Sequence, residues 1–324
     1  MSLLTICSQV CNSIGIFSPS TIVGNTDETA IRLLGAAQDE GEALARRPEN
    51  GWVCMITEYD FYTSATANNI NGTIQTSGGV GQITGLTLGT TQNPVTAGNW
   101  YVFGTNVPQQ AIITSVTNSD PNSIVTFNQP ALVATATAGQ FTLGQSDYAL
   151  PSDFQRVVDS TLWDRSRFWS MRGPQSPQQW QLYKSSVIGR ASIQRRFRFR
   201  EINGAQMFSI DPVPTDNGSA LVFEYVSNAW CKSSGGTKQT MWEADTDVGI
   251  LDEYLIRLGV KWRMLKGLGF AYQSELDEYE HEVSKAIAKD GGMAILDMTP
   301  NDQLTLIGPW NLPETGYGSG VFGA

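Results

Sequence analysis

The chain has 324 residues, 41% of them hydrophobic, and a formal net charge of −10. This length is sufficient for one large domain or for two to three ordinary ones. The acidic balance argues against a protein that grips or reads nucleic acid, because such proteins need clustered Lys and Arg to neutralise phosphates. It is compatible with a wall around DNA, since a negative surface repels the backbone and leaves it mobile.

The four cysteines, Cys7, Cys11, Cys54 and Cys231, are spread along the chain without a CxxC pair. This spacing favours reduced, partly buried thiols over a disulfide framework. Cys7 and Cys11 could share a helix face, but His281 is the only histidine. Core positions are therefore favoured over a zinc site, and we expect no metal and no cofactor.

The N-terminus has no positively charged leader, and no apolar run approaches the roughly 20 residues of a membrane span. We therefore expect a soluble chain, made in the cytoplasm and without a membrane partner.

Two helices are predicted in the first sixty residues. Apolar residues recur at steps of three and four from Leu3 to Ile14. Asn25 stands three residues before Glu28, a pattern typical of a capping box at the start of a second helix. That helix closes at Arg46 and Arg47, where cations suit the C-terminal dipole.

The segment 64–146 differs sharply from its flanks. It contains no Lys or Arg and a single acid, Asp120. Short β-type runs (GQITGLTL, WYVFGT, AIITSVT, SIVTF, QFTLG) alternate with Gly, Asn, Pro and Asp-Pro turns. This pattern predicts a compact antiparallel sandwich or small barrel that forms its own unit.

Residues 147–240 remain β-type, with ordinary charge and many aromatics. The run from Ser192 to Ile202 alternates, which predicts Phe197 and Phe199 on one face and arginines on the other. A second strand is predicted from Leu221 to Ser227. The sequence TDNG at 215–218 separates it from the run MFSI, as expected for a meander.

The last structured region is helical again. Apolar residues from Leu251 to Leu265 predict a helix capped by Thr246 or Asp247 and ended by Gly267 and Gly269. A second amphipathic stretch, 276–287, completes a helical hairpin. The remaining residues, rich in Pro and Gly, cannot form a core alone and are expected to form an extended arm.

These patterns together predict an α+β fold. We expect a helical bundle made by the N- and C-terminal helices, with a small antiparallel β domain looped out. A β-sandwich or barrel-like domain is inserted, and an extended C-terminal arm follows. The predicted parts are the N-terminal helices (1–63), the inserted neutral β domain (64–146), the β part of the core (147–240), the helical hairpin (241–291) and the arm (292–324).

No catalytic constellation is evident, so we do not expect an enzyme. His281 lies in the charged stretch DEYEHEVSK, where a solvated surface side chain is the better interpretation. Phosphate-binding, nucleophile-elbow and zinc-protease motifs are missing from the sequence. Isolated carboxylate pairs carry almost no weight in a chain with 31 acids.

Arg196, Arg198 and Arg200 are interface candidates, because they share one strand face. Three arginines could bind phosphate, face solvent, or pair with acids of a neighbouring subunit. In an acidic protein the last interpretation is favoured. Trp310, in the terminal arm, is the fourth interface candidate.

Several segments resemble the head-to-tail adaptor proteins of short-tailed phages. They are YALPSDFQRVVDSTLWDR (148–165), GPQSPQQWQ (173–181), RFRFREINGAQMFSIDP (196–212), FEYVSNAW (223–230) and WEADTDVGILDEYLIRLGVKWRMLKGLGF (242–270). The ordered set is more specific than any single segment. The segment of about 80 residues before Tyr148 departs from the family, which generally has a short connection there.

The resemblance implies a ring, usually of twelve copies, under the portal vertex. Its implied partners are the portal protein, the tail nozzle or tube protein and further copies of itself. Genomic DNA would pass through the channel without sequence-specific binding. The arm would insert into the portal or an adjacent subunit, or remain a mobile terminus.

Two alternatives remain open. The chain could be another tail component, such as a nozzle or tail-tube protein. The neutral insert could also bind carbohydrate on the host surface, although its aromatic cluster Trp100-Tyr101-Phe103 is more often core than a sugar platform.

Overall fold

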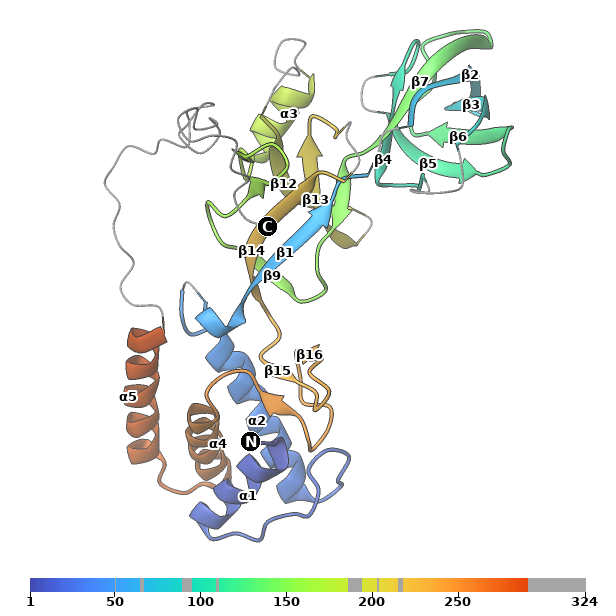
Figure 1. Cartoon of the computed structure of the whole chain (residues 1–324). Helices are drawn as coiled ribbons and strands as arrows, with labels where there is room; N and C mark the ends of the chain where they lie inside the picture. The colour runs from blue at the N-terminus through green and yellow to red at the C-terminus, as the bar shows by residue number, and fades with distance from the viewer. Residues whose placement is uncertain are drawn as a thin grey trace, which may run out of the picture. The chain divides into compact units, whose positions relative to one another are not determined.

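The computed structural model describes residues 1–49, 51–64, 67–88, 95–108, 111–185, 194–202, 204–214 and 218–290. These residues form two compact units. The first comprises Met1–Tyr59, Pro151–Val158 and 224–290, and the second comprises Asp60–Leu150 and Asp159–Phe223. Five α-helices and mostly antiparallel strands are present in the described ranges (Figure 1), so the predicted α+β class is confirmed.

Both predicted N-terminal helices are confirmed. Helix α1 (Leu3–Ile14) begins where the Ser2 hydroxyl accepts a hydrogen bond from the Thr5 amide and ends at Gly15, whose φ of 80° is left-handed. Helix α2 spans Glu28–Ala45. The predicted capping box at its start is wrong, because the helix begins after Asp27 and the Asn25 side chain instead accepts from the Asp27 amide, 2.9 Å away. Asn25 therefore forms a local turn ahead of the helix.

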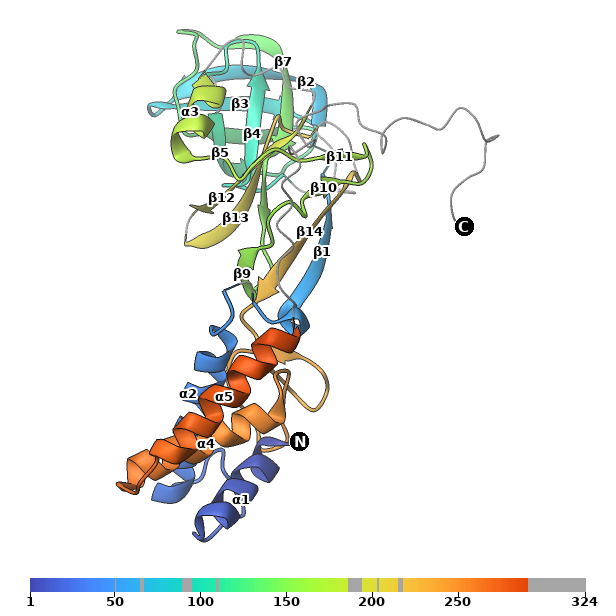
Figure 2. The same cartoon turned by 90° about the vertical axis from the view of Figure 1, so that its left-hand side faces the viewer.

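Helix α4 (Glu253–Leu268) and helix α5 (Gln273–Asp290) form the predicted hairpin and lie side by side (Figure 2). The predicted cap of α4 is wrong. The side chain that accepts a hydrogen bond from the first turn, at the Tyr254 amide, belongs to Asp252 and not to Thr246 or Asp247. The helix continues through Gly267 and ends at Gly269, with a φ of 78°. Helix α4 also packs against α1 and α2.

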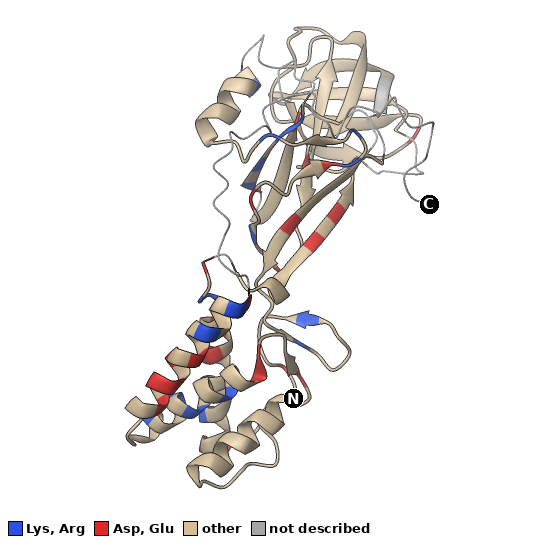
Figure 3. Ribbon diagram, turned by 60° about the vertical axis from the view of Figure 1, so that its left-hand side comes forward, with Lys and Arg blue, Asp and Glu red and all other residues tan. Residues whose placement is uncertain are grey.

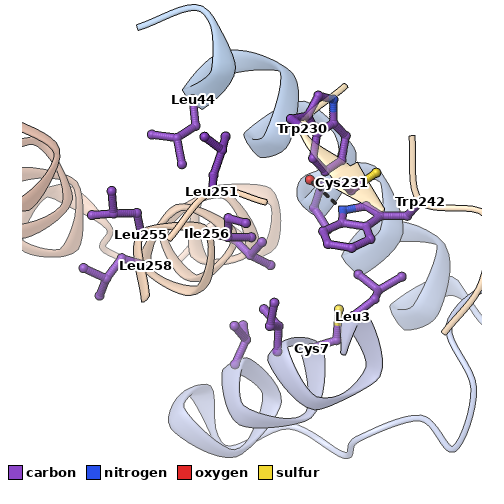
Figure 4. Close-up of a cluster of buried hydrophobic side chains, with 14 of the residues drawn as sticks. Leu3, Cys7, Leu44, Trp230, Cys231, Trp242, Leu251, Leu255, Ile256 and Leu258 are labelled. Atoms are coloured by element: carbon purple, nitrogen blue, oxygen red, sulfur yellow. Dashed lines mark hydrogen bonds between the residues drawn. The ribbon is translucent and has the colours of Figure 1, made fainter. Parts of the chain in front are cut away.

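A continuous hydrophobic cluster fills the first unit (Figure 4). The rings of Trp230 and Trp242 meet edge to face, with centroids 5.1 Å apart. The Trp242 indole nitrogen donates to the Ala37 carbonyl, 3.3 Å away. Cys7 and Cys11 are fully buried in this cluster, as the core interpretation predicted.

Short elements complete the first unit. They are a 3-10 turn η1 (Val53–Met55), β9 (Phe154–Val157), β15 (Cys231–Lys232), β16 (Lys238–Gln239) and β17 (Val248–Gly249). Strands β1 (Ile56–Tyr62) and β14 (Ala220–Ser227) begin in one unit and end in the other.

Six strands of the second unit close into a barrel in the order β2-β3-β6-β5-β4-β7 (Figure 1). The strands are β2 (Ala67–Ser77), β3 (Val80–Leu86), β4 (Trp100–Gly104), β5 (Ala111–Thr117), β6 (Ser123–Phe127) and β7 (Thr137–Gln145). Buried aliphatic and aromatic side chains, Phe127 and Phe141 among them, fill the interior. Gly81 permits this packing, because a Cβ there would lie 2.1 Å from the Phe127 ring.

Two further sheets pack through phenylalanines. One has the order β12-β13-β8, from Arg196–Ile202, Ala205–Asp211 and Asp147–Ala149. The other has the order β1-β14-β10-β11, where β10 is Trp163–Asp164, β11 is Trp169–Ser170, and β9 also pairs with β14. The Phe208 and Phe223 rings stack with centroids 5.8 Å apart.

The predicted meander of β13 and β14 is therefore wrong. The two strands lie in different sheets, and their aromatic faces meet because each sheet must bury its apolar side. Most of the TDNG turn falls outside the described residues. In the part of the chain that is described, no helix is long and apolar enough to cross a membrane.

Candidate functional site

The predicted arginine face lies on β12 (Figure 3). Residues of β12 pair with β13 so that Arg196 is opposite Asp211, Arg198 opposite Ser209 and Arg200 opposite Met207. Phe197 and Phe199 occupy the other face and pack on Phe208. The alternation predicted from the sequence is thus present, and the three arginines share one side of the sheet.

Arg200 is engaged inside the chain. Its Nη2 lies 2.9 and 3.0 Å from the two carboxylate oxygens of Asp147 and 2.6 Å from the Tyr101 hydroxyl. Its Nε donates to the Ser209 hydroxyl at 2.7 Å. Asp147 is fully buried, and burial raises the pKa of Tyr101 to about 12. These contacts link barrel strand β4 to β8, β12 and β13.

Arg196 is also largely enclosed, with 8% of its surface exposed. Helix α3 (Pro177–Ser185) covers it, and its guanidinium lies 3.7 Å from the centroid of the Tyr183 ring. Asp211 lies 3.9 Å from Arg196 and 2.9 Å from the ammonium group of Lys184. Arg196 and Lys184 therefore share one carboxylate beneath the helix.

Arg198 is half-buried, and no described carboxylate forms an ion pair with it. Beside it lies Arg172, which forms a parallel bridge with Arg196 and is exposed. Residues paired across a parallel bridge point to the same side of the sheet, so Arg172 joins the arginine face. Sequence reasoning missed Arg172, because no strand periodicity marks it. Trp310 lies outside the described residues, and the role of the predicted interface residues toward a partner stays a prediction.

Charge is distributed unevenly along the chain. Residues 159–223 contain nine Lys and Arg against five Asp and Glu, a net charge of +4 within a chain of −10. Residues 273–290, which form α5, contain six acids and two lysines, a net charge of −4 without the histidine. The cationic region surrounds β12 and α3, and the acids of α5 gather in its first half (Figure 3).

The acidic motifs of the resemblance have structural roles in the first unit. Asp245 accepts hydrogen bonds from the amides of Ile22 and Val23 at 3.1 and 2.8 Å. Asp247 accepts from the amides of Glu243 and Ala244, both at 2.8 Å. The ADTD turn thus holds the segment between α1 and α2.

The LPSDF segment makes a similar connection. Asp153 accepts from the hydroxyls of Tyr225 and Ser227 at 2.8 and 2.6 Å, and the Lys238 ammonium lies 3.6 Å away. The hydrogen bonds and the lysine outweigh the effect of burial and lower the pKa of Asp153 below its ordinary 3.8.

Glu40 is fully buried between three helices and was not identified from the sequence. The Tyr279 hydroxyl donates to its Oε1 at 2.6 Å, and the Arg263 Nε donates to its Oε2 at 2.8 Å. Burial raises the pKa of Glu40 despite these two donors. Gly259 makes room for the carboxylate, because a Cβ there would lie 2.0 Å from it.

Two thiols of the helical core are kept protonated by their surroundings. Burial raises the pKa of Cys7 and of Cys231 to about 12, so neither is a thiolate at neutral pH. His281 is exposed on α5, as predicted. No group of three or more His, Cys, Asp and Glu that could hold a metal occurs within the described ranges.

The aromatic cluster of the barrel divides between two environments: Trp100 belongs to the barrel core, the Tyr101 hydroxyl bonds Arg200 outside that core, and Phe103 is half-buried. Trp100 and Tyr101 are 2% and 3% exposed, and the core interpretation is confirmed for Trp100. Neither can offer the open ring face on which a sugar stacks.

Comparison with known proteins identifies a family. No curated protein matches the chain. The model of the SU10 adaptor protein family matches residues 119–303, more than half of the chain. The matched region begins in the turn between β5 and β6 and includes β12 to β14, α4 and α5. That family is one of structural phage adaptors, which is not a class of enzymes. The N-terminal helices and barrel strands β2 to β5 precede the match, whereas barrel strands β6 and β7 lie inside it. The chain belongs to the SU10 adaptor protein family.

Proposed function

We propose that the chain forms the head-to-tail adaptor ring of a phage particle, joining the portal to the tail. Membership of the SU10 adaptor family carries this proposal. The chain is accordingly a structural component of the virion, located at the head–tail junction. Its partners are the portal protein, the tail nozzle or tube protein, and further copies of itself in a ring of twelve.

The ring surrounds a channel through which genomic DNA passes without sequence-specific binding. The net charge of −10 supports this role, because an acidic wall does not hold the phosphate backbone. The cationic side chains Arg196 and Arg200 are occupied by carboxylates of the same chain, which supports the same interpretation.

Each predicted part of the chain has its own role in the proposed adaptor. Residues 1–63 and 241–291 form a helical bundle that serves as the scaffold, and residues 147–240 form its β part. The described contacts of α4 with α1, α2 and α5 support the bundle. Residues 64–146 form an inserted domain, supported by the closed barrel. The arm, residues 292–324 with Trp310, contacts the portal or an adjacent subunit.

A nozzle or tail-tube role is the alternative within the virion. Host-surface carbohydrate binding by the barrel is less well supported, because Trp100 and Tyr101 are buried. Glycan binding by the full chain, measured on a glycan array, would favour that role over a spacer or contact domain.

Imaging of particles tests the proposal. We expect cryo-electron microscopy of the phage that encodes this chain to show it as a ring between portal and tail. A copy of the chain fused to a small tag would add density at that position. Density at the distal end of the tail, or at the capsid surface, would contradict the adaptor role.

A further inference from the structure

The arginine face of β12 divides into two pairs with different surroundings. Arg196 and Arg200 have carboxylates of their own chain at 3.9 and 2.9 Å. Arg198 and Arg172 have no ion-pair partner in the described part of the chain. Arg172 is bridged to Arg196, and Arg198 follows Arg196 by two residues on the same face, so Arg172 and Arg198 are diagonal neighbours on one side of the sheet.

We propose that Arg172 and Arg198 bind the acidic first half of α5 of a second copy of the chain. This contact rests on the proposed ring, in which neighbouring copies touch, and it assigns the ring contact to Arg172 and Arg198. Arg196 and Arg200 pair with carboxylates of their own chain and are not assigned to the contact.

The acids of α5 also divide into those with an ion-pair partner in the same chain and those without one in the described residues. Glu275 pairs with Lys261 at 2.8 Å, Glu282 pairs with Lys285 at 2.7 Å, and Glu280 pairs with Arg47. Asp277 and Glu278 are adjacent and exposed, and no described cation pairs with either. Adjacent residues of a helix point about 100° apart, so the two carboxylates lie on neighbouring sides of α5 and each can accept one guanidinium group.

Charge complementarity favours a second copy over DNA. Phosphate binding strong enough to hold a duplex needs several cations, each neutralising one phosphate. Two arginines of this face have no ion-pair partner in the described part of the chain, and the chain as a whole is acidic. A segment of net charge +4, residues 159–223, and a helix of net charge −4 in the same chain can instead meet repeatedly around a ring.

A charge-swap experiment in assembled particles tests the contact. One variant carries Arg172→Glu and Arg198→Glu, a second carries Asp277→Arg and Glu278→Arg, and a third carries all four changes. Each full-length variant complements a phage lacking the gene, and the adaptor content of purified particles is measured by quantitative mass spectrometry. A matched control reverses two exposed cations elsewhere, Arg46→Glu with Lys232→Glu.

We expect each double variant to weaken every contact between copies by about 30-fold and to be largely absent from particles. The fourfold variant restores incorporation, because every contact in a ring of identical copies is then reversed together. The control incorporates as the natural chain does. Thermal melting of each purified variant verifies that the exposed changes leave the fold intact.

Two results would overturn the inference. Normal incorporation of the Arg172→Glu, Arg198→Glu variant would exclude the contact, and loss that the fourfold variant does not restore would place the partner elsewhere. If the natural chain binds a short DNA duplex and the double variant does not, while incorporation is unchanged, the arginines serve DNA instead. Imaging tests the proposed function separately, since a ring that ignores the charge swap would retain its adaptor role.

Discussion

The barrel and the helical unit bury different kinds of side chain. The barrel interior is aliphatic and aromatic, and its one acid, Asp120, is exposed at a turn. The helical unit has a comparable apolar cluster, but it also encloses Glu40 and Asp247, which are 0% and 1% exposed. Both cores exclude water, yet only the helical one carries charged groups inside.

The difference follows from how each fold aligns its parts. Every barrel strand pairs with its neighbours through a ladder of backbone hydrogen bonds, which sets the register without help from charged side chains. Helices have no such ladder between them. Glu40 contacts Arg263 and Tyr279, more than 200 residues away, and fixes how α2 meets α4 and α5. We infer that the buried polar groups select one arrangement of these helices, and mutation of Glu40 tests this inference.

The largest expected effect comes from Glu40→Ala. It leaves the Arg263 guanidinium and the Tyr279 hydroxyl without their acceptor, which we expect to destabilise the helical unit by about 3 to 5 kcal/mol. Urea denaturation of the full chain, followed by hydrogen exchange resolved along the sequence, measures the loss. Exchange should rise in α2, α4 and α5 and stay unchanged in the barrel. Glu42→Ala, at an exposed position of α2, is the matched control; equal effects of the two changes would remove the role assigned to Glu40.

Substitution of two glycines of α2, Gly41 and Gly35, distinguishes the effect of packing on stability from the effect of helix propensity. A Cβ at Gly41 would lie 2.3 Å from the Trp230 ring, whereas a Cβ at Gly35 would meet nothing within 4 Å. We expect Gly41→Ala to destabilise the helical unit by about 1 to 3 kcal/mol, since the indole must move. The same substitution at Gly35 should stabilise it by up to about 1 kcal/mol, because alanine favours the helix. Thermal melting compares the two variants, and the same sign for both would refute the packing argument.

A smaller effect is expected where the barrel meets the arginine face. Tyr101→Phe removes the hydroxyl that lies 2.6 Å from Arg200, while the ring stays in place. We expect a loss of about 1 kcal/mol, together with faster exchange at β4 and β12. Tyr183→Phe is the control, because the stacking of Arg196 on that ring needs no hydroxyl. Indistinguishable exchange in the natural chain and Tyr101→Phe would show that the contact does not join the barrel to the sheet.

Periodic burial accounts for what could be predicted from the sequence. The apolar steps of three and four gave α1, α2, α4 and α5 their places, and the runs between turns marked five of the six barrel strands. Strand β2 escaped because Asn, Gly and Thr fill it, so no apolar alternation identifies it. The pairing of β13 with β8 depends on residues about 60 positions apart, which local pattern cannot specify.

The same limit applies to the candidate site. Alternation placed Arg196, Arg198 and Arg200 on one face, but their different surroundings come from Asp147, Tyr101 and α3. Glu40 lies in the stretch QDEGE, where a lone acid resembles its solvated neighbours. Its burial depends on a space left by Gly259 in another helix. Contacts made across long sequence separations decide which charges face a partner.

The difference in buried charge predicts different responses to pH. Burial raises the pKa of Glu40 above its ordinary 4.5, so the folded state binds this proton more tightly than the unfolded state. Protonation of Glu40 therefore adds stability that is fully present below pH 4.5 and is lost as pH rises through the folded-state value. Each unit of difference between the two pKa values corresponds to about 1.4 kcal/mol.

Glu40→Gln isolates this contribution, because glutamine is neutral at every pH. Urea denaturation at several values from pH 4.5 to pH 8 should show that the natural chain gains stability relative to the Glu40→Gln variant as pH falls.

Asp153 acts in the opposite sense and only at lower pH. Its pKa is depressed below 3.8, so its contribution to stability is lost as pH falls through that lowered value. The barrel, with Asp120 as its one charged residue, supplies the internal control. Hydrogen exchange of its amides, corrected for the intrinsic effect of pH, should stay constant over the same range. Parallel pH profiles for the natural chain and the Glu40→Gln variant would mean that Glu40 stays ionised in its buried position, with Arg263 sufficient to stabilise the charge.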